Sequence, residues 1–289
     1  MKDSKSGAKA SLIASMLIFG TIGIFRHYIP CSSGFIAFVR GLVGTATLAL
    51  VLLIGKRKPD FAGIRKNALK LFFSGAFLGF NWIFLFEAYK YTTVAAATLC
   101  YYMAPVLIIL LSPVLFKEKL TLRRGLCAAV STLGMVIISG VFGGGFSGLR
   151  GILLALCAAC MYAALVLINK KITGLDGLDR TITQLFISAA VLLPYLLLTE
   201  KGIPQADGKT VALLLIVGVV HTGLAYALYF GSIARVKVQT AAIFGYVDPA
   251  VAILLSALIL KEPLTLLTAV GAVLILGSAL ISELPDKKA

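Results

Sequence analysis

Long uninterrupted runs of apolar residues are the feature of this sequence that most restricts its fold. Runs 94–116 and 238–260 are each 23 residues long, and the first carries no charged side chain. About 20 apolar residues in a helix are enough to cross the hydrocarbon core of a bilayer. Apolar residues make up 60% of the chain and the mean hydropathy is +0.99, against about 45–50% apolar residues in soluble domains. The sequence therefore predicts an integral membrane protein embedded in a lipid bilayer.

Ten such runs divide the chain, and only short connections separate them. Connections such as GKRKPD and KGIPQADGK are rich in Gly, Pro and charged residues, which is typical of turns and loops. None of them is long enough to hold a soluble domain. The sequence predicts an all-α integral membrane protein with ten transmembrane helices, at residues 10–29, 34–55, 71–91, 94–116, 122–141, 151–170, 181–199, 211–233, 238–260 and 264–283.

The basic residues alternate between the two sides of this expected bundle. If the amino terminus lies inside, the inner segments hold 20 of the 27 Lys and Arg residues, the outer segments hold six, and Arg40 lies within a helix. Basic residues concentrate in the cytoplasmic segments of membrane proteins. We therefore expect a multi-pass plasma-membrane protein with both termini in the cytoplasm. The net charge of +15 then needs no nucleic-acid partner.

A stretch of the first half recurs in the second. Residues 84–122 align with residues 228–266 without gaps, at an offset of 144, and 14 of the 39 positions are identical. Each half has an odd number of expected helices, so the second half runs through the membrane in the opposite direction. We expect two inverted five-helix repeats, residues 1–145 and 146–289, an arrangement typical of secondary transporters with alternating access.

The residues that carry this repeat also resemble a known family. LFEAYKYTTVAAATLCYYMAPV, followed by KEKLT, in the first half and HTGLAYALYFGSIARVKVQTAAIFGYVDPAVAILLSALILKEPLT in the second resemble the EamA branch of the drug/metabolite transporter superfamily. The resemblance covers nearly the whole chain and fits an arginine early in helix two, here Arg40, and a proline in helices four and nine. It implies ten helices in two inverted repeats and transport of small metabolites, often amino acids, usually out of the cell. The resemblance is specific evidence for the fold and weak evidence for the substrate.

Two prolines fall at the middle of their apolar runs. Pro105 and Pro249 are each the twelfth residue of a 23-residue run. Proline has no N–H group, so the carbonyls four residues earlier, of Tyr101 and Gly245, lose their helical partners and the helix can kink. The freed carbonyls can serve a ligand. Alternatively, the prolines only bend their helices and neighbouring groups bond the carbonyls.

Asp248 directly precedes the second of these prolines. An ionised aspartate at the centre of a membrane helix costs about 2.5–3.5 kcal/mol, and acids inside membrane segments usually serve function. We expect Asp248 to bind an amine of the substrate or to carry protons. The alternative is that Asp248 caps a half-helix that begins at Pro249 and bonds its own backbone.

Other polar and aromatic residues are expected at similar depth. His221 is the middle residue of the span 210–232 and can exchange a proton with Asp248, although a lone helical histidine is more often a packed core residue. Aromatic faces hold apolar side chains or cationic amines. The expected substrate pocket therefore consists of Asn81, Trp82, Tyr101, Tyr102, His221, Tyr226, Gly245 and Asp248, with plain helix packing as the alternative for each.

Arg40 and Glu87 are expected near the outer ends of helices two and three. They can pair to form a gate, or each can extend separately to the membrane surface. Matching glutamates, Glu118 and Glu262, follow the repeated apolar runs. We interpret these two as solvated charges or as stabilisers of helix starts.

The sequence argues against several other functions. Its five cysteines fall mostly within predicted helices, and Cys157 and Cys160 have no second pair or histidine, so neither a metal nor a cofactor is expected. GIPQADGKT departs from the spacing of a phosphate-binding loop and lies in an outer connection. Asp248 is the one aspartate within a predicted span, which excludes an aspartyl-protease dyad. We do not expect an enzyme.

The preferred interpretation is a secondary transporter that exports small organic metabolites, such as amino acids or related amphipathic solutes, by alternating access. Protons are the expected coupling ion through Asp248. The alternatives are a passive facilitator of a small metabolite and an efflux protein for drugs or cationic solutes. A monomer suffices for each of these functions, and a dimer is compatible with them.

Overall fold

A computed structural model of the chain describes residues 5–117, 121–138, 148–200, 202, 206–233, 235–236 and 244–283. Every regular element in these ranges is a helix. The predicted all-α membrane fold is confirmed. Parts of the expected helices 122–141 and 238–260, the residue Glu118 and both chain ends lie outside the described residues.

The first half of the chain forms eight helical elements, because two of its five apolar runs are interrupted and one connection is itself helical. These elements are α1 (Lys5–Gly20), α2 (Ile22–Tyr28), α3 (Ser33–Ile54), α4 (Phe61–Lys66), α5 (Ala68–Ala88), α6 (Val94–Tyr101), α7 (Ala104–Phe116) and α8 (Leu122–Ile138).

The second half has helices from the equivalent apolar runs in the same sequence, but its first run is one continuous helix and its third run contains a π-helical turn. Its elements are α9 (Leu149–Asn169), α10 (Gly177–Thr199), α11 (Gly208–Gly218), the π-helical segment η2 (Val219–Leu224), α12 (Ala225–Ile233), α14 (Val247–Ile259) and α15 (Leu266–Glu283).

Seven helical segments in the described ranges are long and apolar enough to cross a membrane, judged by length and composition. They are Ser6–Tyr28, Ser33–Ile54, Ala68–Ala88, Val94–Phe116, Leu149–Asn169, Gly177–Thr199 and Gly208–Ser232. Two shorter apolar helices, Val247–Ile259 and Leu266–Ser282, follow, and α8 occupies the remaining expected position. The apolar runs of the sequence therefore locate the helices to within a few residues.

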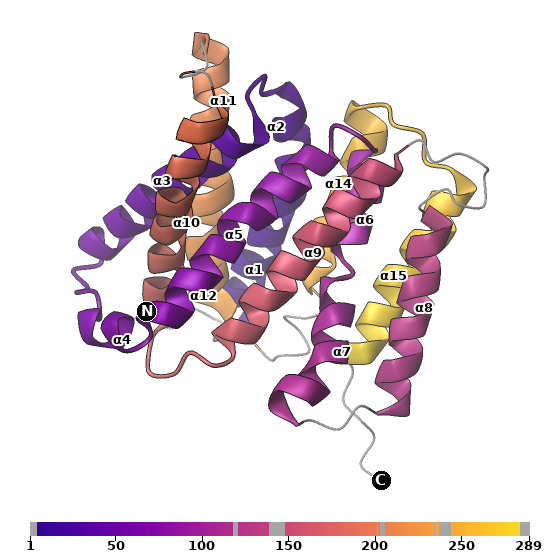
Figure 1. Ribbon diagram of the computed structural model, residues 1–289, viewed down its shortest axis with the longest axis horizontal. Coiled ribbons are helices and arrows are strands. Elements are labelled where there is room, and N and C mark those ends of the chain that lie inside the picture. The colour runs from indigo at the N-terminus through magenta and orange to yellow at the C-terminus, as the bar shows by residue number, and fades with distance from the viewer. Residues whose placement is uncertain are drawn as a thin grey trace.

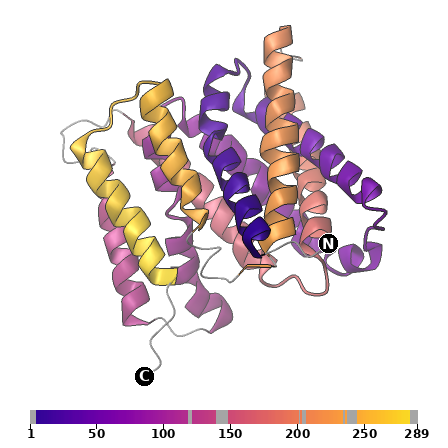
Figure 2. The ribbon, with the colours of Figure 1, turned by 180° about the vertical axis from the view of Figure 1, so that it is seen from behind.

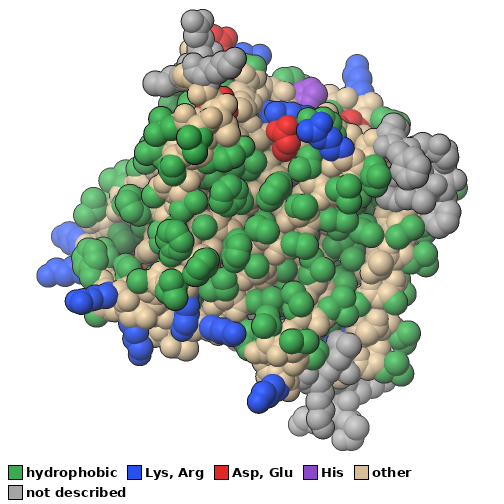
Figure 3. Space-filling view, viewed as in Figure 1, with side chains coloured by type: hydrophobic (Ala, Val, Ile, Leu, Met, Phe, Trp, Pro, Cys, Tyr) green, Lys and Arg blue, Asp and Glu red, His purple; other side chains and the backbone are tan. Residues whose placement is uncertain are grey.

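The helices run between two ends of the molecule. The start of α1 and the end of α15 lie at one end, while α2, the start of α11 and the end of α14 lie at the other (Figures 1 and 2). Hydrophobic side chains cover the middle of the face in Figure 3, and charged side chains gather toward its lower and upper edges. This distribution is what a lipid-facing surface between two aqueous boundaries requires.

The packing of the helices repeats about an axis between the two halves. α5 packs on α9 and α10 of the second half, and the corresponding elements α12 and η2 pack on α1 and α3 of the first half. α3 contacts its counterpart α10, α6 contacts α14, and α8 contacts α15. These contacts between halves occur either as matching pairs or between helices of equivalent apolar runs, as two inverted repeats should.

Glycines bring several of these helices into close contact. A Cβ atom at Gly75 in α5 would lie 2.8 Å from Cβ of Ile187 and 2.9 Å from the carbonyl oxygen of Gln184, both in α10. A Cβ atom at Gly223 in η2 would lie 2.3 Å from Cγ2 of Thr47 in α3. Small residues at membrane helix interfaces allow this close approach of two backbones.

Polar contacts join the halves at the end where the chain starts. Arg57 Nη2 lies 3.0 Å from Oδ2 of Asp179, and Arg57 Nη1 lies 3.2 Å from Oδ2 of Asp176. Partial burial opposes ionisation of Asp176, but the Leu178 N–H and the Arg57 guanidinium outweigh burial and lower the pKa of this carboxyl. Asn67 also donates to the Thr173 carbonyl at 3.1 Å. These contacts hold α4 and α5 against the start of α10.

The close contact at Gly75 gives a test of the α5–α10 packing. We expect Gly75→Ala to lower the free energy of unfolding by about 1–3 kcal/mol, because the added methyl group overpacks the interface. Gly231→Ala in α12 is the matched control, since no atom lies within 4 Å of its added Cβ and alanine favours a helix over glycine by about 1 kcal/mol. Thermal unfolding in detergent measures both. A Gly75→Ala protein as stable as Gly231→Ala would contradict this packing.

Candidate functional site

Two interrupted helices meet in the middle of the molecule. The apolar run Val94–Phe116 divides into α6 and α7, with Tyr102 and Met103 between them. Pro105 is in the first turn of α7, where a missing N–H removes no helical hydrogen bond. The sequence predicts a kink at this proline, and the structure has two separate helices instead. α14 begins at Val247, so that Pro249 likewise falls in the first turn of a helix.

Tyr102 bridges the two interruptions. Its hydroxyl donates to Oδ2 of Asp248 at 2.9 Å and lies 3.4 Å from the carbonyl oxygen of Gly245. The capping alternative for Asp248 is not what the structure has, because Tyr246 is the N-cap residue of α14 and makes no side-chain cap bond. Asp248 is partly buried and bonds across to the other half of the chain. The predicted residues Tyr102, Gly245 and Asp248 are therefore together.

Aromatic rings extend from this pair. The ring centroids of Tyr101 and Tyr102 lie 6.1 Å apart, and those of Tyr101 and Tyr162 lie 5.6 Å apart, both edge to face. Tyr226 packs against Phe19 at 5.3 Å. The sequence interpretation missed Tyr162. Its position near the middle of the expected helix 151–170 is the signal that identifies it.

Arg40 is buried among aromatic rings. Only 5% of its surface is exposed, and its guanidinium carbon lies 4.1 Å from the ring centroid of Trp82. Its Nε donates to Thr222 Oγ1 at 2.8 Å. Asp248 and Tyr226 are close enough for electrostatic interaction with Arg40. Within the described part of the chain, however, no ion pair within 4.0 Å joins Arg40 to Asp248.

The expected gate between Arg40 and Glu87 is not formed. Glu87 Oε2 instead accepts from Ser33 Oγ at 2.8 Å and pairs with Lys90 Nζ at 2.8 Å. Glu87 lies in the last turn of α5, where Lys90 follows it closely, while Arg40 points toward η2. Burial of Arg40 also rules out the alternative in which it extends to the membrane surface.

Thr222 is a second residue that the sequence interpretation missed. Its hydroxyl donates to the Val217 carbonyl, five residues earlier, at 3.0 Å, which fits the wider turn of a π-helix. Such turns occur frequently at functional sites. The residue that matches Arg40 in the repeat, Gln184, makes a similar contact: its Nε2 donates to Ser74 Oγ in α5 at 2.7 Å. The two equivalent positions therefore both bond the third helix of the other half.

His221 and Asn81 have partners of their own. His221 is 1% exposed, its Nε2 lies 2.8 Å from Thr21 Oγ1, and its ring packs edge to face on Phe25 at 4.6 Å. It does not bond Asp248, so the expected direct proton exchange between them has no contact to support it. Asn81 is buried and its Nδ2 donates to the Ala158 carbonyl at 2.7 Å. Both side chains fix neighbouring helices.

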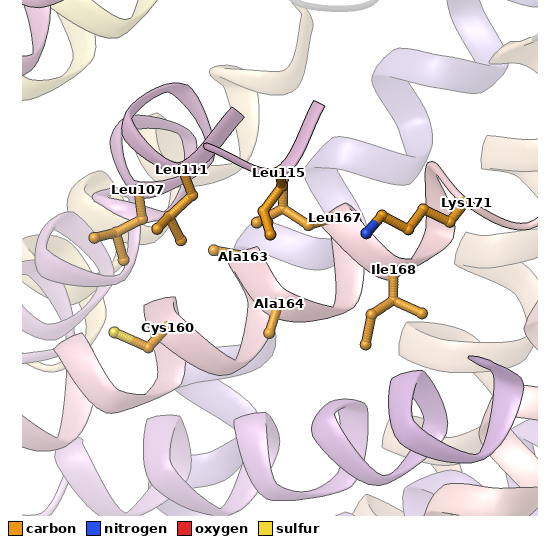
Figure 4. Close-up of a pocket in the computed structure, with 9 residues that line it drawn as sticks. All are labelled: Leu107, Leu111, Leu115, Cys160, Ala163, Ala164, Leu167, Ile168 and Lys171. Atoms are coloured by element: carbon orange, nitrogen blue, oxygen red, sulfur yellow. The ribbon is translucent and has the colours of Figure 1, made fainter. Parts of the chain in front are cut away.

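A separate cavity of about 300 Å³ lies between α7 and α9. Figure 4 shows leucines of α7 facing small side chains of α9, with Lys171 at one end. The lining residues are Leu107, Leu111, Leu115, Cys160, Ala163, Ala164, Leu167, Ile168 and Lys171. None of the predicted site residues is among them. This apolar hollow is therefore distinct from the group around Asp248.

Comparison with known proteins agrees with this architecture. The EamA-like transporter family matches residues 8–140 and 149–283. The chain is 32% identical to the uncharacterized transporter YxxF of Bacillus subtilis (strain 168) over 254 residues, 87% of this chain and 81% of that protein. It is 26% identical to the protein PecM of Dickeya dadantii (strain 3937) over 274 residues, 90% and 91% of the two chains. A protein crystal structure with 18% identity superposes with a TM-score of 0.70, covering 96% of this chain and 98% of the other.

The ring contact of Arg40 can be tested through the single tryptophan of the chain. Arg40→Lys loses the planar contact with Trp82 and the bond to Thr222, so we expect a loss of about 2 kcal/mol of stability and a changed Trp82 emission spectrum. Arg150→Lys is the control, because Arg150 lies 4.1 Å from the Tyr91 ring centroid but is exposed. Unchanged melting and emission in Arg40→Lys would contradict the contact.

Proposed function

The chain belongs to the EamA-like transporter family, and we propose that it is a secondary transporter that exports small organic solutes by alternating access. The observation that carries the proposal is the bond between Tyr102 and Asp248. This bond joins the interrupted helix of one half to the start of α14 in the other. A transporter site is expected at such interruptions, where two repeats meet near the bilayer midplane.

We assign residues 1–145 and 146–289 to the two rocking halves. Their helix ends support this assignment, because Lys117 after α7 and Lys261 after α14 are equivalent in the repeat and both adopt positive φ, 56° and 55°. Both termini are proposed to be cytoplasmic in the plasma membrane, and the excess of basic residues in the inner segments supports this orientation. A monomer contains both halves of the proposed site.

The proposed solute is an amino acid or a related amphipathic molecule with an amino group. Asp248 supplies a carboxylate, and a partly buried carboxylate that makes no ion pair within 4.0 Å in the described part of the chain favours an ammonium group as partner. Tyr101, Tyr162 and Tyr226 supply ring faces that attract cations and cover apolar groups. The same carboxylate and ring faces also favour the second candidate function, an efflux protein for cationic solutes.

The remaining predicted residues receive supporting roles in this proposal. Arg40 and Trp82 hold η2 against α3 and α5, while Asn81 and His221 fix helix contacts around the site. Pro105 and Pro249 start the half-helices α7 and α14. Protons are proposed to compete with the solute for Asp248, because one carboxylate cannot hold an ammonium group and a proton at once. This competition is a direct route to proton-coupled exchange.

The proposal predicts the effect of neutralising Asp248. In proteoliposomes, an imposed pH gradient should drive uptake from a panel of labelled amino acids and amines by the wild-type protein but not by Asp248→Asn, a change of similar size that removes the titrating group. Tyr102→Phe should weaken the flux, since it removes the hydroxyl that holds Asp248. Elution of the variants at the wild-type position in size-exclusion chromatography would show that they remain folded.

Asp207→Asn is the matched control for this experiment. Asp207 accepts from the Thr210 N–H at the start of α11, outside the spans, so its variant should keep gradient-driven flux. Gradient-driven flux that persists in Asp248→Asn would overturn the coupling role. Solute flux that ignores the pH gradient and runs only down the solute gradient would favour the passive facilitator.

A further inference from the structure

Glu262 holds together two elements at the end of the molecule opposite to the chain start. Its two carboxylate oxygens accept from the Val94 N–H, at 3.2 and 2.9 Å. Val94 is the first residue of α6, and Thr93 caps the same helix by accepting from the Ala96 N–H at 3.1 Å. A carboxylate at this position is stabilised by the free N–H groups and the positive end of the helix.

The backbone after α14 directs Glu262 toward α6. Lys261 takes a left-handed conformation with φ of 55°, which turns the chain sharply after the helix. The Glu262 N–H then donates to the Ser256 carbonyl at 3.2 Å, and Ser256 Oγ bonds the Glu262 carboxylate. One carboxylate therefore caps the end of α14 through Ser256 and the start of α6 through Val94.

The start of α6 is wedged between this turn and α2. Val94 is 2% exposed, and a Cβ atom at Gly23 in α2 would lie 2.5 Å from its Cγ1. α2, α6 and the end of α14 converge at the upper end in Figure 1. From there α6 leads to Tyr102, and α14 leads back to Asp248. The contact at Glu262 therefore joins the far ends of the two helices that carry this pair.

We propose that Glu262 is the latch that closes this outer end of the transporter, and that its bond to the start of α6 breaks when the outer path opens. The inference rests on the proposed alternating access. The contact joins one helix of each half, so any outward opening between α6 and α14 must break it. A charged acceptor on a helix start is stronger than a neutral one, which makes the carboxylate suited to holding a closed state. Glu262 is a positioning residue here and does not contact the solute.

The test measures access to the outer path without any solute. In a background with the five native cysteines replaced by alanine, Ala252→Cys introduces a thiol on α14 one turn beyond Asp248, at a site that is 4% exposed. We expect Glu262→Gln to raise the rate of labelling by a membrane-impermeant thiol reagent from outside by about tenfold or more, the usual range for loss of one charged hydrogen bond. Labelling from inside, in inverted vesicles, should not rise.

Glu200→Gln is the matched control, because Glu200 follows α10 at the same end of the molecule and should leave both rates unchanged. Equal labelling rates in Glu262→Gln and the wild type would overturn the latch. Faster labelling from both sides would also overturn it, because general loosening of the fold predicts that result. Labelling needs no flux, so an absence of transport in the wild type would count against the proposed function and leave this test standing.

Discussion

The lipid core offers no hydrogen bonds, and this constraint decides how the two interrupted helices can be arranged. A backbone group left without a partner in hydrocarbon costs several kcal/mol. Breaking α6 from α7 at Tyr102 and starting α14 at Val247 is therefore tolerable only where protein groups replace the missing bonds. Tyr102 does this from one half to the other, since its hydroxyl lies between the Gly245 carbonyl and the Asp248 carboxylate. At the α6–α7 break, the Tyr102 and Met103 N–H groups donate to the Thr98 and Cys100 carbonyls. The Tyr102 hydroxyl therefore acts on the α14 side, where it bonds the acid that we propose binds the solute.

Much of the fold was predictable because hydrophobic length is a local property. The expected helix 34–55 corresponds to Ser33–Ile54, and the expected helix 151–170 corresponds to Leu149–Asn169. The repeat at an offset of 144 also placed Lys117 and Lys261 at equivalent positions, and both adopt the same left-handed turn. Residue type and spacing along the chain were sufficient for these features, because neither depends on distant contacts.

The partners of the buried charges were not predictable in the same way. Arg40 bonds Thr222, 182 residues away, and Thr222 faces Arg40 from a π-helical segment that shifts the direction of later side chains relative to an α-helix. No residue pattern in HTGL specifies that turn. The sequence paired Glu87 with Arg40 only because both were expected at a similar depth in the membrane. The direction of the side chain decides its partner, and Glu87 faces Ser33 and Lys90. The depth of a residue in the membrane follows from its position in an apolar run, whereas the direction of its side chain depends on how the helices pack.

The difference between the two repeats has a physical consequence for the proposed transport. The position equivalent to Asp248 is Ala104, while Tyr102 and Tyr246 are equivalent and both tyrosine. An acid at both positions would place a second carboxylate at the start of α7, two residues after the Tyr102 that bonds Asp248, and mutual repulsion would favour protonation of one of the two. A single acid avoids this and carries one charge. One proton or one ammonium group neutralises this carboxylate, so in the proposed transport cycle the acid itself adds no net charge to the site when the loaded protein rocks.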